Sequence, residues 1–261
     1  MKARCEHRRR ATLAPLAVLA AAGALALGAC ENPTRPADAS TATLSASRAQ
    51  EAATYRITVH NVAGALQPLT PSVMALHNPA ARIFHPGTAA SAELERVAES
   101  GDVDPLAAAL SGSRQVFDSG VAPGPDGPIL PDQTATLTLQ GPPGARISLV
   151  SMLVCTNDGF TGIDSARLPK RVGASASFEV QAYDAGTEQN TEARSDLVPP
   201  CVMATTGTSG GTGGDQPSIA EDEVIRHHPG IDDDTDGDDI LTVGQHQWDE
   251  VVARIEVERI E

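Results

Sequence analysis

The chain has 261 residues, which is enough for one large domain or two small ones. Hydrophobic residues make up 41% of it but aromatic residues only 3%, so a core would consist of Ala, Val, Leu and Ile, which favours sandwich packing over a cofactor pocket. The formal net charge of −15 gives an acidic surface that repels nucleic acid and anionic lipid, and it argues against both as partners.

A secretory signal peptide is predicted over residues 1–29, because Met1–Arg10 carries five basic residues and an apolar run, Ala11–Ala29, follows. A transmembrane anchor is the alternative, since that run approaches spanning length. The tetrapeptide Leu27–Cys30 resembles the lipobox of bacterial lipoproteins, which implies that Cys30 is acylated and becomes the mature N-terminus. The protein would then be exported and held at the cell membrane or outer membrane through its lipid anchor only. Removing residues 1–29 leaves 14 basic and 33 acidic residues, a net charge of −19 that attracts cations.

Residues 30–52 are rich in Ala, Ser, Thr and Pro and predict a flexible tether, followed by one domain over residues 53–261. Alternating or continuous apolar residues predict strands in this domain. The expected strands are Thr54–Asn61, Ser72–His77, Thr134–Leu139, Ala145–Cys155, Ala176–Tyr183, Glu223–His228 and Val252–Ile260.

One helical insertion is expected between these strands. Thr88 can cap a helix over Ala89–Glu99 that stops at Gly101, and Asp104-Pro105 starts a second short helix. Thr205–Gly214 has the composition of a linker. The fold class predicted is therefore all-β, an antiparallel β-sandwich with a short helical insertion.

Two cysteines remain after the signal peptide and the lipid site are set aside, namely Cys155 and Cys201. A disulfide between them is the economical interpretation in an exported protein. Two buried free thiols are the alternative.

Acidic turns follow two of the expected central strands. The first is Asn157-Asp158-Gly159, and the second runs from Tyr183 to Glu188. Calcium binds six to eight hard oxygens from carboxylates, carbonyls and water on loops that bend around the ion. If both strands emerge at the same end, Asp158, Asp184 and Glu188 would meet there, and three carboxylates repel one another unless a cation lies between them. Solvated turn acids are the alternative.

Several stretches taken together, in order from Thr54 to Glu261, resemble the spondin N-terminal domain. They are YRITVHN, QPLTP, FHPGTAASAELERVAESGD, SLVSMLVCTNDGFTGID, YDAGTE and VARIEV. The resemblance implies an antiparallel sandwich similar to calcium-dependent membrane-targeting domains, with an ion held at one end. It also implies a role related to extracellular adhesion.

Carried over by position, the metal ligands implied by the resemblance are Asp158, Asp184 and Glu188, with Glu188 a departure from the Asp of animal members. The sequence thus favours a non-enzymatic, calcium-binding recognition or adhesion module at the cell envelope, whose partner is an unidentified extracellular protein or polysaccharide. The alternative is a metal-independent structural envelope lipoprotein.

Three further motifs carry weaker signals. Asp232–Asp239 opens like an EF-hand loop, but Val243 occupies the position of the bidentate Glu, so a solvated loop or weak cation binding is expected. His227-His228 has no third ligand at a suitable spacing for zinc. The G-x-S-x-G pattern around Ser209 would suggest a serine hydrolase, but no strand-turn-helix context surrounds it.

Overall fold

The computed structural model describes residues 52–64, 66–214, 216–232 and 237–261. Contacts divide the chain into residues 1–44 and 45–261, and the described residues all belong to the second unit. The expected signal peptide over residues 1–29, the lipidation site Cys30 and the tether up to residue 51 therefore lie outside the described residues.

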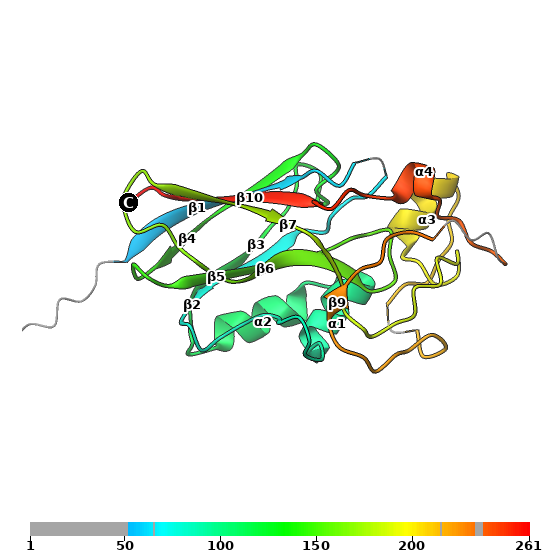
Figure 1. Ribbon diagram of the computed structural model, residues 1–261, viewed down its shortest axis with the longest axis horizontal. Helices are drawn as coiled ribbons and strands as arrows, with labels where there is room; N and C mark the ends of the chain where they lie inside the picture. The colour runs from blue at the N-terminus through cyan, green and yellow to red at the C-terminus, as the bar shows by residue number, and fades with distance from the viewer. Residues whose placement is uncertain (1–51, 65, 215, 233–236) are drawn as a thin grey trace, which may run out of the picture. The chain divides into compact units, whose positions relative to one another are not determined.

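Two antiparallel sheets face each other across a hydrophobic core (Figure 1). One sheet has the order β4–β1–β10–β7, formed by Thr134–Gly141, Ala53–Asn61, Ala253–Arg259 and Ser175–Val180. The other has the order β3–β2–β5–β6–β8–β9, formed by Val116–Ala122, Ser72–His77, Arg146–Met152, Gly159–Arg167, Ala182–Asp184 and Arg226–His227. The predicted antiparallel β-sandwich is confirmed.

Side-chain alternation sets the register of the smaller sheet. Tyr55, Ile57 and Val59 of β1 are fully buried, and the residues between them face outward. Ile57 lies opposite Val257 of β10 and Leu137 of β4. A slip of one residue would turn this apolar set toward solvent, so the alternation fixes the pairing.

Two helices cover the outer face of the larger sheet (Figure 1). They are α1 (Ala92–Ser100) and α2 (Asp104–Gly112). Leu94, Val97 and Ala98 form the buried stripe of α1 and pack in the same cluster as Phe160 of β6.

The predicted caps of these helices are partly wrong. Ser91, not Thr88, caps α1, because its side chain accepts a hydrogen bond from the backbone N–H of Leu94. The Thr88 hydroxyl donates instead to the carbonyl of His85. Gly101 ends α1 as predicted, with a left-handed φ of 69°.

Other predicted elements differ from the structure in informative ways. The strand expected over Ala176–Tyr183 is two strands, β7 and β8, which belong to different sheets and part at Gln181. The strand β6 was not predicted at all. The first two residues of the expected linker, Thr205 and Thr206, form the end of a helix, α3 (Pro199–Thr206). A second short helix that was not predicted, α4 (Val243–His246), precedes β10.

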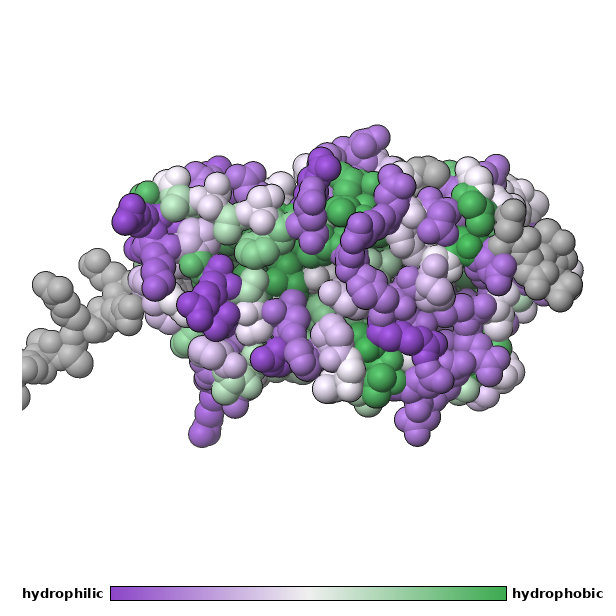
Figure 2. Space-filling model, viewed as in Figure 1, coloured by the Kyte–Doolittle hydropathy of each residue, from purple (hydrophilic) through white to green (hydrophobic). Residues whose placement is uncertain are grey.

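The face drawn in Figure 2 carries hydrophilic residues over most of its area. Hydrophobic residues show in several separate patches, the largest of them near the middle of this face. This distribution agrees with a mostly polar exterior on this face.

Candidate cation site at one end of the sandwich

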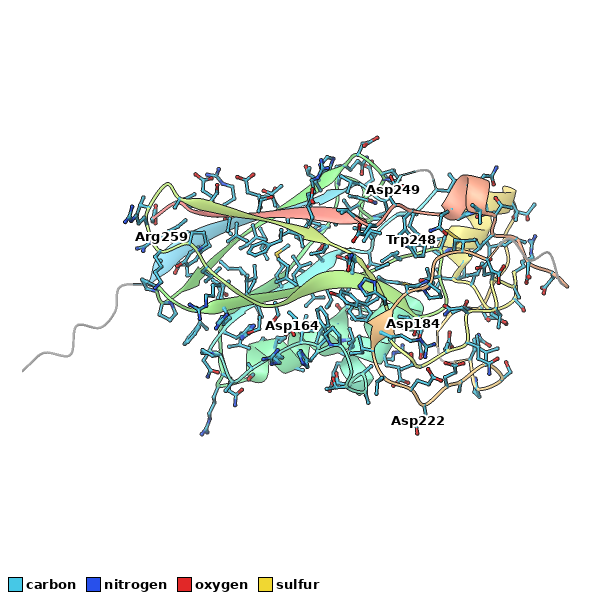
Figure 3. All side chains as sticks on the ribbon, in the orientation of Figure 1. Asp164, Asp184, Asp222, Trp248, Asp249 and Arg259 are labelled. Atoms are coloured by element: carbon cyan, nitrogen blue, oxygen red, sulfur yellow. A yellow bond between two sulfur atoms is a disulfide. The ribbon has the colours of Figure 1, made fainter. Side chains whose placement is uncertain are left out.

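Two of the three predicted ligand residues come together where β6 begins and β8 ends. Gly159 of β6 lies opposite Asp184 of β8 in an antiparallel ladder, so Asp158 and Asp184 leave the sheet at the same end. Figure 3 shows Asp184 in this region, beside the strand β9. The strands thus deliver both carboxylates to one place, although Asp158 precedes β6 rather than directly following β5.

The Asp158 carboxylate holds the turn that contains the third predicted ligand residue. Its Oδ2 atom accepts hydrogen bonds from the backbone N–H groups of Thr187 and Glu188, at 2.7 and 3.0 Å, and from the Thr187 hydroxyl at 3.2 Å. Its Oδ1 atom is buried and has no hydrogen-bond partner in the structure. One oxygen therefore organises the loop, and the other is left with unmet acceptor capacity.

A glycine makes the turn between Asp184 and Glu188 possible. Gly186 has φ of +72°, a conformation that other residues rarely adopt, and its N–H donates to Asp184 Oδ1 at 2.8 Å. A Cβ atom at this position would also lie 2.9 Å from the backbone carbon of Glu223. Both the tight turn and the close approach of the neighbouring loop therefore require glycine here.

Arg226 already compensates the charge of Asp184. The Asp184 side chain is fully buried, and its Oδ2 atom lies 3.2 Å from the Arg226 guanidinium and accepts a hydrogen bond from the Asn190 side chain at 2.9 Å. Arg226 also pairs with Glu221 and Glu223. Arg226 was not predicted as part of the site, although a single Arg in an acidic segment that ends in a short strand was a usable signal.

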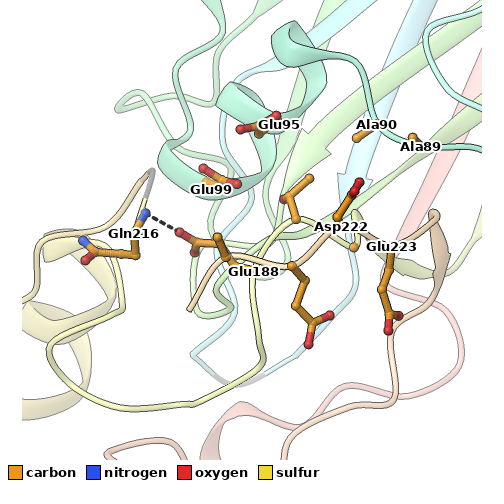
Figure 4. A pocket seen from close by; sticks show the side chains of 12 residues that line it. Ala89, Ala90, Glu95, Glu99, Glu188, Gln216, Asp222 and Glu223 are labelled. Carbon is orange, nitrogen blue, oxygen red and sulfur yellow. Dashed lines mark hydrogen bonds between the residues drawn. The ribbon is translucent and has the colours of Figure 1, made fainter. Parts of the chain in front are cut away.

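Glu188 points to another side of the same region. Its Oε1 atom accepts a hydrogen bond from the backbone N–H of Gln216 at 2.7 Å, whereas Oε2 is buried without a partner. The side chain lines a cavity with Glu99 of α1, and Figure 4 shows the two carboxylates near each other. Glu188 is 1% exposed and Glu99 3%. Glu99 was not predicted as a site residue, because it adjoins the apolar stripe of α1 in the last turn.

Burial makes the ionised forms of Asp158 and Glu188 costly. It raises the pKa of Asp158 to about 6, with the Asp184 charge adding to the effect and the N–H donors of the turn opposing it. It raises the pKa of Glu188 to about 8, opposed by the Gln216 hydrogen bond and reinforced by Glu99 and Asp158. An added positive charge at this end of the sandwich would relieve both penalties.

The carboxylates share a region but do not converge on one point. Among the residues that the structure describes, no group of three or more His, Cys, Asp or Glu side chains is arranged to hold a metal ion. Asp184 faces Arg226, Asp158 faces the 187–188 turn, and Glu188 faces the cavity beside Glu99. Their role as metal ligands stays a prediction.

The predicted disulfide is confirmed. Cys155, just after β5, is bonded to Cys201 in α3. It ties the segment that leads to Asp158 to the helix at this end of the domain. On the chain-entropy model, closing a loop of this length stabilises the fold by about 4 kcal/mol.

The other candidate motifs take no part in this site. In the Asp232–Asp239 run, residues 233–236 lie outside the described part of the chain. His228 is buried with its ring edge against Trp248, at a centroid distance of 5.0 Å, whereas the neighbouring His227 is exposed. Ser209 is exposed on the loop that follows α3, so a helix precedes it, which is the reverse of the arrangement around a hydrolase nucleophile.

The family model described as Spondin_N, the spondin N-terminal domain, matches residues 66–201 and so covers just over half of the chain. The chain therefore belongs to the spondin N-terminal domain family. These domains are non-catalytic extracellular modules, and this membership fits a recognition or adhesion module rather than an enzyme. No curated protein matches the chain.

The matched segment contains Asp158, Asp184 and Glu188 as well as both disulfide cysteines. Among the described residues there is no helix that is both long and apolar enough to cross a membrane.

Proposed function

We propose that the protein is an exported, lipid-anchored recognition or adhesion module that binds calcium at the Asp158 end of its sandwich. The observation that supports this most strongly is a pair of buried carboxylates, Asp158 and Glu188, each with one oxygen that lacks a partner. A buried carboxylate of this kind is destabilising unless a cation or donor meets it.

The donor chemistry fits calcium. Calcium prefers carboxylate and amide oxygens on loops, and the free acceptors here are Asp158 Oδ1, Glu188 Oε2 and the amide oxygen of Asn190. Asp158, Glu188 and Asn190 would supply the first ligands. Asp184 would join them only by releasing Arg226, its present partner.

When bound, calcium would supply positive charge to two desolvated acids. The chain's own residues already fix the loops on either side, since Asp158 holds the 187–188 turn and Gly186 permits it. The positive charge would stabilise the ionised forms of Asp158 and Glu188, which burial otherwise disfavours, and would stiffen this end of the domain. A stiff end loses less conformational entropy when it meets an extracellular protein or polysaccharide.

The anchor part of the proposal rests on the sequence alone. Residues 27–30 resemble a lipobox, and acylated Cys30 would hold the domain at the cell membrane or outer membrane, with the tether over residues 30–52 setting its reach. Metabolic labelling with a fatty-acid analogue tests this part: label is expected on the protein and is expected to disappear in Cys30→Ala.

A metal-independent structural lipoprotein is the second candidate. The observation in its favour is Arg226, which already neutralises Asp184 without a metal ion. The two candidates differ in their response to calcium, because only the first gains stability from it.

Calorimetric titration of the purified full-length chain with calcium distinguishes the two. Saturable heat is expected with the unaltered protein and at least tenfold weaker binding with Asp158→Asn. Glu256→Gln is the matched control, since this acid is exposed on β10 and makes the same change in net charge. Absence of heat, or equal binding in both variants, would favour the metal-independent candidate.

A further inference from the structure

An acidic cavity lies between α1 and the two loops around residues 186–188 and 220–223 (Figure 4). Its volume is about 160 Å³. None of the described lining residues is basic. Six of them are acidic, namely Glu95, Glu99, Glu188, Glu221, Asp222 and Glu223. A cluster of acidic side chains on a protein surface is commonly solvated and binds nothing, so a binding site here requires a second observation that points to a ligand.

Glu188 provides that observation. It is 1% exposed, it lines the cavity, and its Oε2 atom has no hydrogen-bond partner, whereas Oε1 is held by the Gln216 N–H. A buried carboxylate oxygen beside a second buried acid, Glu99, creates a strong local preference for a cationic donor.

The cavity does not have the geometry of a metal site. No three carboxylates among the described residues are arranged to hold an ion, so the acids surround a space rather than a point. That space is several times the roughly 30 Å³ that one water molecule occupies in the liquid. It has room for the end of an organic cation with several N–H donors.

Local charge compensation is uneven around the rim. Arg226 pairs with Glu221 and Glu223, which partly neutralises that side. Glu95 and Asp222 lie on other parts of the lining, and Ala89 and Ala90 add a small apolar patch. A Lys or Arg side chain fits such a lining, because its charged head can lie among the carboxylates while its apolar stem lies against the two alanines.

We propose that this cavity receives a basic side chain, Lys or Arg, from a protein partner. The partner's chemistry is thereby defined as a segment with an exposed positive charge, which the acidic domain would also attract from a distance. The inference deepens the proposed recognition function and rests on it, but it does not require calcium. Because both proposals use Glu188 Oε2, bound calcium would compete with the basic side chain for this atom.

The test is a two-dimensional NMR titration of the full-length chain in EDTA with three probes. N-acetyl-lysine amide and N-acetyl-arginine amide carry the two cationic heads, and N-acetyl-norleucine amide is the neutral control. Saturable shifts are expected at Gly186–Glu188 and at residues 220–223 with one or both cationic probes. A dissociation constant on the order of millimolar is expected for a fragment of this size. The cationic probe with the tighter binding identifies the preferred head.

Variants locate the binding. Glu188→Gln, and separately Glu95→Gln with Asp222→Asn, are each expected to weaken the cationic probe at least fivefold. Glu93→Gln lies on the same helix but does not line the cavity, so it should leave binding unchanged. The variant that combines Glu95→Gln with Asp222→Asn changes residues that are less buried than Glu188, so it keeps the test valid if Glu188→Gln unfolds the domain.

The proposal is overturned if N-acetyl-norleucine amide shifts the same resonances equally, or if the cavity variants bind the cationic probes as Glu93→Gln does. It is also overturned if the shifts do not saturate at a probe concentration about tenfold above the expected dissociation constant. Because EDTA removes calcium from this experiment, its failure is distinct from failure of the calorimetric calcium titration.

Discussion

Glu188 should make the stability of the calcium-free domain depend on pH in the neutral range. Burial raises its pKa from 4.5 to about 8. Between these values the folded state holds a proton that the unfolded chain has released, so the free energy of unfolding falls as pH rises. Each pH unit costs up to about 1.4 kcal/mol, and from roughly pH 6.5 to 8 the loss is about 1.5 kcal/mol, because the acid is half ionised at the upper limit.

The other groups with shifted pKa values affect stability mainly outside this pH range. The pKa of Asp158 is raised from 3.8 to about 6, so the stability that this residue contributes in its protonated form is lost mainly as the pH rises between these two values. Burial lowers the pKa values of His77, His228 and His246, so these residues destabilise the fold as pH falls toward and below their ordinary value of 6.5. Their effect has the opposite sign and amounts to about 0.4 kcal/mol for each histidine from roughly pH 6.5 to 8, but it is common to the unaltered protein and to a Glu188 variant, so it cancels when the two are compared.

Urea denaturation in EDTA at several pH values, with the disulfide intact, measures the effect. The free energy of unfolding of the unaltered protein, measured relative to that of Glu188→Gln, should fall by about 1.5 kcal/mol from roughly pH 6.5 to 8, because the histidine contributions are the same in both proteins. Glu256→Gln should keep the slope of the unaltered protein. An unchanged slope in Glu188→Gln would refute the assignment of the buried proton to this residue.

Three further changes test the framework around the site. Replacing Cys155 and Cys201 together by Ser should cost about 4 kcal/mol, read from urea midpoints, and no loss would contradict the stabilising role of the disulfide. Gly162→Ala should destabilise the domain by several kcal/mol or prevent folding, because its Cβ would lie 1.9 Å from a backbone oxygen of β5; a fully stable variant would show that the strands separate easily. Arg226→Gln should cost about 2 kcal/mol without calcium by leaving Asp184 buried and uncompensated, less than for a fully buried pair because the Arg side chain is 39% exposed. Added calcium should recover part of this loss in thermal melts, and an equal loss with and without it would argue against ion binding at Asp184.

Strands with clear alternation could be predicted from the sequence. Tyr55, Ile57 and Val59 in β1 and Ile255 and Val257 in β10 are buried as expected, because one face of each strand meets the core. Such a pattern depends only on local spacing and on which face is apolar.

Elements defined by their neighbours could not be predicted in this way. The strand β6 contains two glycines and an aspartate and has no alternation, yet β5 and β8 pair with both of its edges and bury its first half. The break at Gln181 is equally invisible, because the same alternating sequence continues while its hydrogen-bond partners change from one sheet to the other. The helix α3 has prolines in its first turn, where they are tolerated, but no side chain caps it and the cysteine and valine that follow are weak helix formers.

The candidate site shows the same division. That Asp158, Asp184 and Glu188 lie in one region followed from acids placed at strand ends. Their actual partners come from distant segments, with Glu99 on α1 and Arg226 on β9. Single-sequence spacing carries no information on contacts between segments so far apart, so it could not show that the three acids face different ways.

A crystal structure of the protein grown with calcium tests the central claim most directly. An anomalous calcium peak coordinated by the side-chain oxygens of Asp158 and Glu188 is the predicted result. A well-ordered end of the sandwich at saturating calcium with no ion there, and with Asp184 still paired to Arg226, would contradict it.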